Sequence, residues 1–248
     1  MNPQIHLPTS LWQAVEASPL LWLTLTLLVT LGARWISSHT RTPGANPVLL
    51  SIVAIGSLLA LTGTPYDTYF GATRFIHFLL GPATVALAVP LYNRVSKLRR
   101  MSEPIAIALV AGSLPRDPRG AILAAVGLGA TLGASEPVLR SLAPKSVTTA
   151  IAMGVSEKIR GLPPLTAVLV ILTGIIGAIT ADPLLDLLKV RDQSPRGFAI
   201  GVASHGIGTA RAFENSGEAG AFSGLGMGLN GILTATLIPI LAKLLGKI

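Results

Sequence analysis

Long apolar runs are the feature that most constrains what this chain can fold into. They are Leu20 to Leu31, Pro47 to Leu61, Leu79 to Leu91, Leu165 to Ile179 and Gly220 to Leu241. A helix of roughly 20 residues crosses a hydrocarbon core of about 30 Å, so runs of this kind predict membrane-spanning segments. Half of the 248 residues are apolar, only 12% are charged and the mean hydropathy is +0.65, more than the core of a soluble domain requires. Lipid is therefore the expected solvent for most of the surface.

The runs predict helices and not a β-barrel, because they are continuously apolar instead of alternating. The first run has no basic region before it and is about as long as a membrane span, so it is interpreted as the first helix and not as a cleavable signal peptide. The expected helices are Pro19 to Ile36, Pro47 to Gly63, Arg74 to Tyr92, Pro104 to Gly133, Pro163 to Asp182 and Gly217 to Leu245.

Two further segments, Pro144 to Val155 and Arg196 to Phe213, are too polar and too short for ordinary spans. They predict half-helices or re-entrant elements, which membranes tolerate only where protein or a water-filled cavity surrounds them. Gly81 to Thr84 and Gly206 to Thr209 echo each other and suggest an inverted repeat, although such residues also pack ordinary helix bundles. The expected fold is an all-α integral membrane protein with about six to eight transmembrane or half-membrane helices and two broken segments.

The basic residues predict orientation in a membrane. The net charge is +8, but these residues stand singly at the ends of apolar runs without interleaved aromatics, so nucleic-acid binding is not expected. Arg34 and Arg41 mark one loop and the segment Arg94 to Glu103 marks another, which predicts that both loops are cytoplasmic and the N-terminus outside. Lys189 and Arg191 predict a third cytoplasmic loop, whereas the side of the C-terminus stays open.

The first candidate site is the proline-initiated segment Pro144 to Thr149. Helix N-terminal amides, Lys145 and the hydroxyls of Ser146, Thr148 and Thr149 together suit the oxygens of an anion. In the alternative interpretation, Lys145 is an interfacial anchor and the hydroxyls bond to the helix backbone.

The second candidate site is Ala203 to Arg211. Its glycines, Gly206 and Gly208, let backbones approach closely, and Ser204 and Thr209 supply hydroxyls. His205 could bind a carboxylate or carry a co-transported proton, since its ordinary pKa lies near neutrality. Arg211 could bind a carboxylate through two nitrogens or pair with Glu157, Glu214 or Glu218.

A third candidate region is the glycine-rich stretch Gly220 to Gly231, whose spacing most often indicates tight helix packing. The strongly polar side chain in the span that follows is that of Asn230, which could line a cavity or bond a neighbouring helix. His77 is interpreted as a packing histidine.

Enzyme signatures are missing from the sequence. There is no HExxH, Walker A or GxSxG motif, and the absence of cysteine excludes disulfides, thiolate metal sites and cysteine catalysis. Ser204 and His205 are adjacent, so on a helix they point about 100° apart and would not pair as nucleophile and base. No catalytic residue, cofactor or metal is expected.

Four stretches resemble the LrgB/CidB family of bacterial membrane proteins, which has a plant relative, the plastidial glycolate/glycerate transporter. They are Leu79 to Tyr92, Pro144 to Met153, Ser204 to Ala212 and Ser223 to Ala235. The chain departs from the family pattern at Ala150, where proline is common, and at Pro115 to Gly120, which interrupt a usually continuous span. The resemblance implies an N-terminal helix and loop over residues 1–45 and an LrgB-like transport domain over residues 46–248.

The resemblance implies two functions. One is transport of small monocarboxylates such as glycolate, glycerate or pyruvate; the other is antiholin-like modulation of murein hydrolase export and lysis with a small LrgA/CidA-type partner. The polar broken segments favour a secondary carrier, expected as a homodimer of multi-pass chains in the bacterial cytoplasmic membrane. Its two broken segments are expected to meet near the bilayer midplane and bind the carboxylate, with proton coupling through His205 or uniport both open.

Overall fold

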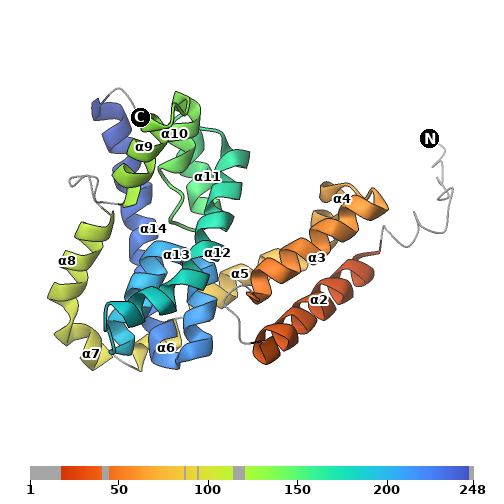
Figure 1. Ribbon diagram of the computed structural model, residues 1–248, viewed down its shortest axis with the longest axis horizontal. Coiled ribbons are helices and arrows are strands. Elements are labelled where there is room, and N and C mark those ends of the chain that lie inside the picture. Colours follow the sequence, from red (N-terminus) through yellow and green to blue (C-terminus); the bar gives the residue numbers. More distant parts are fainter. Residues whose placement is uncertain (1–17, 41–44, 87, 94, 114–120, 246–248) are drawn as a thin grey trace, which may run out of the picture. The chain divides into compact units, whose positions relative to one another are not determined.

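The computed structural model describes residues 18–40, 45–86, 88–93, 95–113 and 121–245. These residues form thirteen helices and no strand (Figure 1). The helices are α2 (Pro19–Thr40), α3 (Pro47–Thr62), α4 (Tyr66–Ala72), α5 (Arg74–Ala86), α6 (Ala88–Tyr92), α7 (Val95–Arg100), α8 (Ser102–Ser113), α9 (Ala121–Thr131), α10 (Glu136–Leu142), α11 (Thr149–Lys158), α12 (Pro163–Leu187), α13 (Gln193–Asn215) and α14 (Gly217–Leu245).

The chain divides into two compact units, Met1–Ala86 and Leu87–Ile248. The domain boundary predicted after residue 45 falls inside the first unit and stays a prediction. In that unit, Asn46 caps α3 by accepting hydrogen bonds from the amides of Val48 and Leu49. Trp22 of α2 meets Tyr69 of α4 edge to face, with ring centroids 5.5 Å apart.

Most of the expected helices are present. The described parts of the expected helix Arg74 to Tyr92 are α5 and α6, and residue 87 between them lies outside the described residues. The described parts of Pro104 to Gly133 are α8 and α9, and the interruption at Pro115 to Gly120 lies outside the described residues. In addition, α12 continues five residues past its expected end at Asp182, where Arg196 neutralises the carboxylate at an N–O distance of 3.0 Å.

Three described helices, α2, α12 and α14, are long and apolar enough to cross a membrane. Their outer faces expose large apolar side chains, such as Leu172 and Ile176 of α12 and Ile232 of α14. Water would penalise such a surface, whereas lipid does not. The fold class of helical membrane protein is confirmed; the number of spans stays a prediction.

A helical hairpin forms between residues 193 and 215 and is called hairpin 2. Arg196 near its start and Asn215 at its end both contact the carboxylate of Asp182, at 3.0 Å and 2.8 Å. A straight helix would separate these two residues by about 28 Å, so the chain must reverse between them. The reversal lies at His205, whose φ is 41° and ψ −135°.

A second hairpin, called hairpin 1, consists of α10, residues 143–148 and α11. Ser141 on its first arm and Ser156 on its second both lie against Thr166 of α12, where Thr166 Oγ1 is 3.2 Å from the Ser141 carbonyl oxygen and 2.7 Å from Ser156 Oγ. The turn between the arms contains Lys145 and Ser146. Both segments predicted to be broken therefore form helical hairpins.

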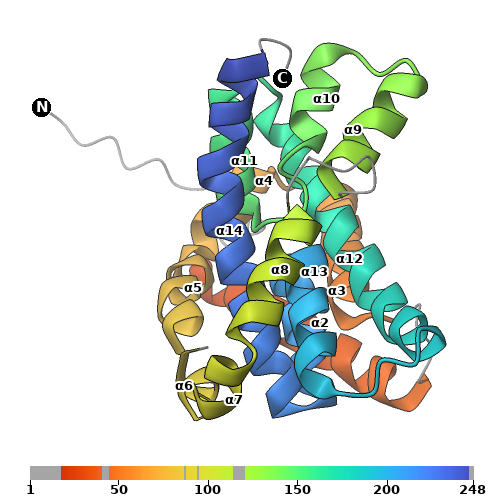
Figure 2. The ribbon, with the colours of Figure 1, turned by 90° about the vertical axis from the view of Figure 1, so that its left-hand side faces the viewer.

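The hairpins approach the long helices from opposite ends. Along α12, Thr166 contacts the arms of hairpin 1 and Asp182 contacts those of hairpin 2. Along α14 the order is reversed, since Ser223 contacts hairpin 2 and Ile238 packs against hairpin 1. Figure 2 shows α11 beside one half of α14 and α13 beside the other half.

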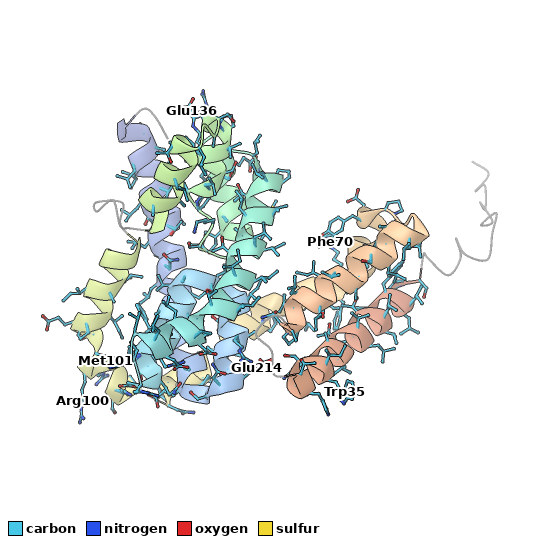
Figure 3. The ribbon with its side chains drawn as sticks, viewed as in Figure 1. Trp35, Phe70, Arg100, Met101, Glu136 and Glu214 are labelled. Atoms are coloured by element: carbon cyan, nitrogen blue, oxygen red, sulfur yellow. The ribbon has the colours of Figure 1, made fainter. Side chains whose placement is uncertain are left out.

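Residues 136–187 and 193–245 thus form two hairpin-plus-helix units of opposite orientation, as an inverted repeat predicts. The echo between Gly81 to Thr84 and Gly206 to Thr209 does not match this repeat, because Gly81 to Thr84 lie in α5 of the first unit. In Figure 3, Glu136 of hairpin 1 marks one end of the second unit, and Arg100 and Glu214 mark the other.

Two of the basic loops lie at the same end of the second unit. Lys97 of α7 pairs with Asp192, which precedes α13, at 2.9 Å, and with Glu218 at the start of α14, at 2.7 Å. The loops predicted to share the cytoplasmic side are therefore joined by an ion pair. Because α14 begins there and runs through 29 residues, its C-terminal end lies at the opposite end of the unit.

Candidate functional site at the hairpin tips

The tip of hairpin 2 fits against two glycines of α12. An added Cβ at Gly174 would lie 2.7 Å from His205 Cε1, and one at Gly177 would overlap Ser204 Oγ. His205 is 4% exposed, and its Nε2 lies 2.9 Å from the carbonyl oxygen of Val170. The absence of side chains at Gly174 and Gly177 therefore lets the tip dock on the middle of α12.

The backbone of His205 is in an unfavourable conformation. A positive φ at a residue with a Cβ costs on the order of 1–3 kcal/mol and persists only where the surroundings fix it. Next to it, Ser204 is 1% exposed, and its Oγ has no hydrogen-bond partner within the described part of the chain. Backbone strain and an unpaired buried hydroxyl at one turn are features that concentrate at functional sites.

The tip of hairpin 1 presents a helix N-terminus and an ammonium group. Thr148 occupies the N-cap of α11 with extended backbone, yet its side chain makes no capping hydrogen bond, and Thr149 is the first helical residue. Lys145 is half-buried, and its Nζ lies 3.5 Å from Ser146 Oγ. No described carboxylate forms an ion pair with Lys145. This tip therefore carries the positive charge of Lys145 and the partial positive charge of the α11 N-terminus, and no described carboxylate neutralises them.

Asn230 joins the two tips. Its Nδ2 donates to the carbonyl oxygen of Ser146 in hairpin 1 at 3.2 Å and to that of Val202 in hairpin 2 at 3.0 Å. In an uninterrupted helix the Val202 carbonyl would accept from the amide of Gly206, and the reversal at His205 lies between the two. Asn230 lies near the middle of α14, and Gly174 lies near the middle of α12. The tips therefore meet midway along both long helices.

The other predicted residues of hairpin 2 stabilise its turn. Thr209 Oγ1 donates to the His205 carbonyl at 2.8 Å and lies 2.9 Å from Ser223 Oγ. At Gly208 an added Cβ would lie 2.5 Å from Ser204 Cβ, so a larger residue would push the two arms apart. Gly206 is exposed, with only Met227 Sδ near the position of an added Cβ, at 3.9 Å.

Arg211 lies away from the tips. Its guanidinium pairs with Glu214 at 3.1 Å and lies 3.7 Å from Asp182, so the pairing with Glu214 that the sequence left open is the one observed. The side chain is 40% exposed and belongs to the charged base of hairpin 2. A role in binding substrate stays a prediction for Arg211 and for the tip residues.

The contribution of α12 to the site is not predicted by the sequence, in which this segment has the composition of an apolar span. Gly174 and Gly177 nevertheless admit the tip of hairpin 2, and Thr166 contacts both arms of hairpin 1. The spacing of two glycines three residues apart inside an apolar run was the available signal.

Hydrogen bonds shift the pKa values of two groups at the base of hairpin 2. Hydrogen bonds from Lys97 to Glu218 and to Asp192 raise the pKa of Lys97. The pKa of Asp192 is lowered by the hydrogen bond from the Ser194 amide and then by Lys97. Both groups therefore stay charged over the physiological pH range.

The comparisons agree with the resemblance seen in the sequence. Residues 26–244 match the LrgB-like family. YwbG of Bacillus subtilis is 35% identical over 219 residues, which cover 88% of this chain and 95% of that protein. Holin-like protein CidB of Staphylococcus epidermidis is 32% identical over 227 residues, covering 90% of this chain and 96% of CidB. Holin-like protein CidB of Staphylococcus aureus is 32% identical over 225 residues, which cover 91% of this chain and 96% of that protein. No solved structure matches the chain significantly. A match of this extent, together with three described helices long and apolar enough to cross a membrane, shows that the protein is a membrane protein of the LrgB-like family.

Proposed function

We propose that the protein is a secondary transporter of small monocarboxylates of the glycolate, glycerate or pyruvate type in the bacterial cytoplasmic membrane. The observation that carries the proposal is the meeting of two hairpin tips at the middle of two antiparallel long helices, where Asn230 binds both. Non-helical backbone at membrane depth is tolerated where it surrounds a binding site or cavity, and transporters place their substrate sites at such breaks.

The chemistry of the tip of hairpin 1 favours an anion. The N-terminal amides of α11 lack a side-chain cap from Thr148, and Lys145 has no carboxylate partner among the described residues. A substrate carboxylate would accept hydrogen bonds from these amides and neutralise Lys145.

The remaining polar groups fit the second oxygen of a 2-hydroxy or 2-oxo acid. Such an oxygen would bond to hydroxyl or amide groups of the set Ser146, Thr148, Thr149, Ser204 and Asn230. Gly206, which is exposed and without close neighbours, lets a small ligand approach the backbone of hairpin 2. His205 is the candidate carrier of a co-transported proton, since it is the histidine at the junction.

The second candidate function follows from the names of the relatives. Proteins about 32% identical to this chain are named holin-like, so a membrane protein that acts with a small holin-like partner of the LrgA/CidA type is the alternative. In that case the tip junction would serve assembly or a pore and would need no substrate chemistry.

Uptake into proteoliposomes separates the two functions. Vesicles containing only this chain are given radiolabelled glycolate, glycerate or pyruvate, with and without an inward proton gradient. A carrier gives saturable uptake that unlabelled substrate competes away, whereas a pore passes unrelated dyes in proportion to their concentration.

Two matched pairs of variants assign the site. Lys145→Ala and His205→Ala are expected to lower uptake at least tenfold, whereas Lys158→Ala and His39→Ala, which change exposed residues of the same types, should leave it within twofold. If Lys145→Ala and His205→Ala both transport like the unaltered chain, the site assignment is wrong.

A further inference from the structure

The two hairpins differ in how they are attached to the long helices. The first arm of hairpin 2 lies with its backbone directly on α14, because added Cβ atoms at Gly197 and Gly201 would overlap the carbonyl oxygens of Ala219 and Ser223. From the other side, an added Cβ at Gly226 would lie 2.6 Å from the Phe198 carbonyl oxygen. Displacing this arm would open a tightly packed interface.

Ion pairs also hold the base of hairpin 2. Arg196, 9% exposed, pairs with Asp186 at 2.6 Å and with Asp182 at 3.0 Å, and it donates to the Val190 carbonyl at 3.0 Å. Ser194 donates to Glu218 at 2.5 Å. Movement of hairpin 2 away from α12 would leave partly buried charges without partners, which is strongly unfavourable.

Hairpin 1 is held by neutral groups. Ser141 Oγ accepts from the Leu162 amide at 2.8 Å, Thr166 Oγ1 contacts Ser156 and Ser141, and Asn230 contacts the Ser146 carbonyl. Its ion pair, Arg140 with Glu136, lies inside α10, and none among the described residues joins hairpin 1 to another helix.

The contacts of hairpin 1 are also individually weak. Thr166 has one proton and donates to one partner at a time, and the Asn230 bond is long at 3.2 Å. At Gly231 of α14 an added Cβ would lie 3.0 Å from the side-chain Cδ1 of Ile151 in hairpin 1, whereas Gly197 and Gly201 of hairpin 2 lie against backbone carbonyl groups of α14. Separation of hairpin 1 from α12 and α14 would therefore break apolar contacts and neutral hydrogen bonds, but no ion pair among the described residues.

We propose that hairpin 1 is the mobile gate of the tip site and that hairpin 2 is its fixed part. The gating role rests on the proposed transport function, whereas the difference in mobility between hairpin 1 and hairpin 2 does not. In this scheme Thr166 is a positioning residue that keeps hairpin 1 closed through Ser141 and Ser156.

The natural absence of cysteine allows a direct test of mobility. Val147 in the turn of hairpin 1 is 1% exposed and Ile200 in hairpin 2 is 2% exposed, so single cysteines at these positions start equally buried. In nanodiscs, Val147→Cys should react with a small methanethiosulfonate reagent at least tenfold faster than Ile200→Cys. Equal rates, or faster reaction of Ile200→Cys, would overturn the proposal.

Hydrogen exchange of the unaltered chain provides a measurement that needs no variant. Amides of residues 152–158, which all lie beyond the first turn of α11, should exchange at least tenfold faster than those of residues 197–204, and comparable protection of the two segments would contradict the proposal.

A matched pair of variants then tests the contacts. Thr166→Val should accelerate exchange in hairpin 1 by about tenfold, because it removes the hydroxyl that contacts both arms. Ser223→Ala removes one hydroxyl contact of hairpin 2 and should change exchange there less than twofold. If hairpin 1 proves mobile in these experiments while no carboxylate is taken up by proteoliposomes, the proposed function fails and the difference between the hairpins stands.

Discussion

Asn230 Nδ2 donates a hydrogen bond of 3.0 Å to the carbonyl oxygen of Val202, three residues before the chain reverses at His205. The same nitrogen donates to Ser146 in the other hairpin, so one side chain of α14 contacts both hairpins near their tips. A carboxamide has two N–H groups and can serve two carbonyls without carrying charge into the membrane interior.

Asn230→Ala should lower the free energy of unfolding by about 2 kcal/mol, because two carbonyl groups lose a donor where little water is available to replace it. Thermal unfolding in nanodiscs measures the effect. Asn93→Ala, at an exposed position of the same residue type, is the control and should shift the midpoint little. A midpoint for Asn230→Ala equal to that of the control would show that the two bonds contribute nothing to stability.

Gly177→Ala should destabilise the second unit by about 1–3 kcal/mol, since the new methyl group would overlap Ser204 Oγ and force the tip of hairpin 2 off α12. Urea or thermal unfolding provides the measurement. Gly56→Ala in α3, where an added Cβ meets nothing within 4 Å, is the matched control and should be neutral or slightly stabilising. Equal stability of the two variants would contradict the docking of the tip described above.

Arg196→Ala should lower the free energy of unfolding by about 1–3 kcal/mol. This lies between the contributions of exposed and of buried ion pairs, because Asp182 is 23% exposed and Asp186 is 59% exposed. Asp182 would keep its contact with Asn215 and lose its principal cation. Arg191→Ala removes a charge of the same sign from an exposed position nearby and should have little effect. The difference between the two thermal midpoints is the measurement, and its absence would mean that the ion pairs at the base of hairpin 2 do not stabilise the fold.

The contact of Lys97 with Asp192 predicts a pH dependence of stability. The pKa of Asp192 is lower in the folded chain, so its contribution is complete above the ordinary pKa of about 3.9 and is lost as the pH falls through the lowered value. The pKa of Lys97 is raised, so its contribution is complete below about 10.4 and is lost as the pH rises through the raised value.

The measurement compares the unaltered chain with Lys97→Met, which keeps the aliphatic stem and removes the charge. The difference in thermal midpoint should be constant between about pH 5 and pH 9 and should shrink at both extremes. A difference that grew on acidification below pH 4 would contradict this assignment.

Local sequence features determined the helices of this protein and the places where they break. Long apolar runs require helices in lipid, since the backbone must bond to itself there, and Asn46 before Pro47 with Gly63 after Thr62 mark the two ends of α3. The polar stretches around Lys145 and His205 predicted breaks for the same reason, because continuous spans do not carry so many polar groups.

Only the tertiary structure decided that these breaks are hairpins whose tips meet. That arrangement depends on contacts between residues far apart in the chain, such as Asn230 with Ser146, and on Gly174 admitting His205. Neither contact has a periodicity or spacing that a linear pattern can show. The tertiary structure likewise decided that Arg211 contacts Glu214 and Asp182. Several carboxylates lie within reach of Arg211 along the sequence, and the packing of the helices determines which of them comes close.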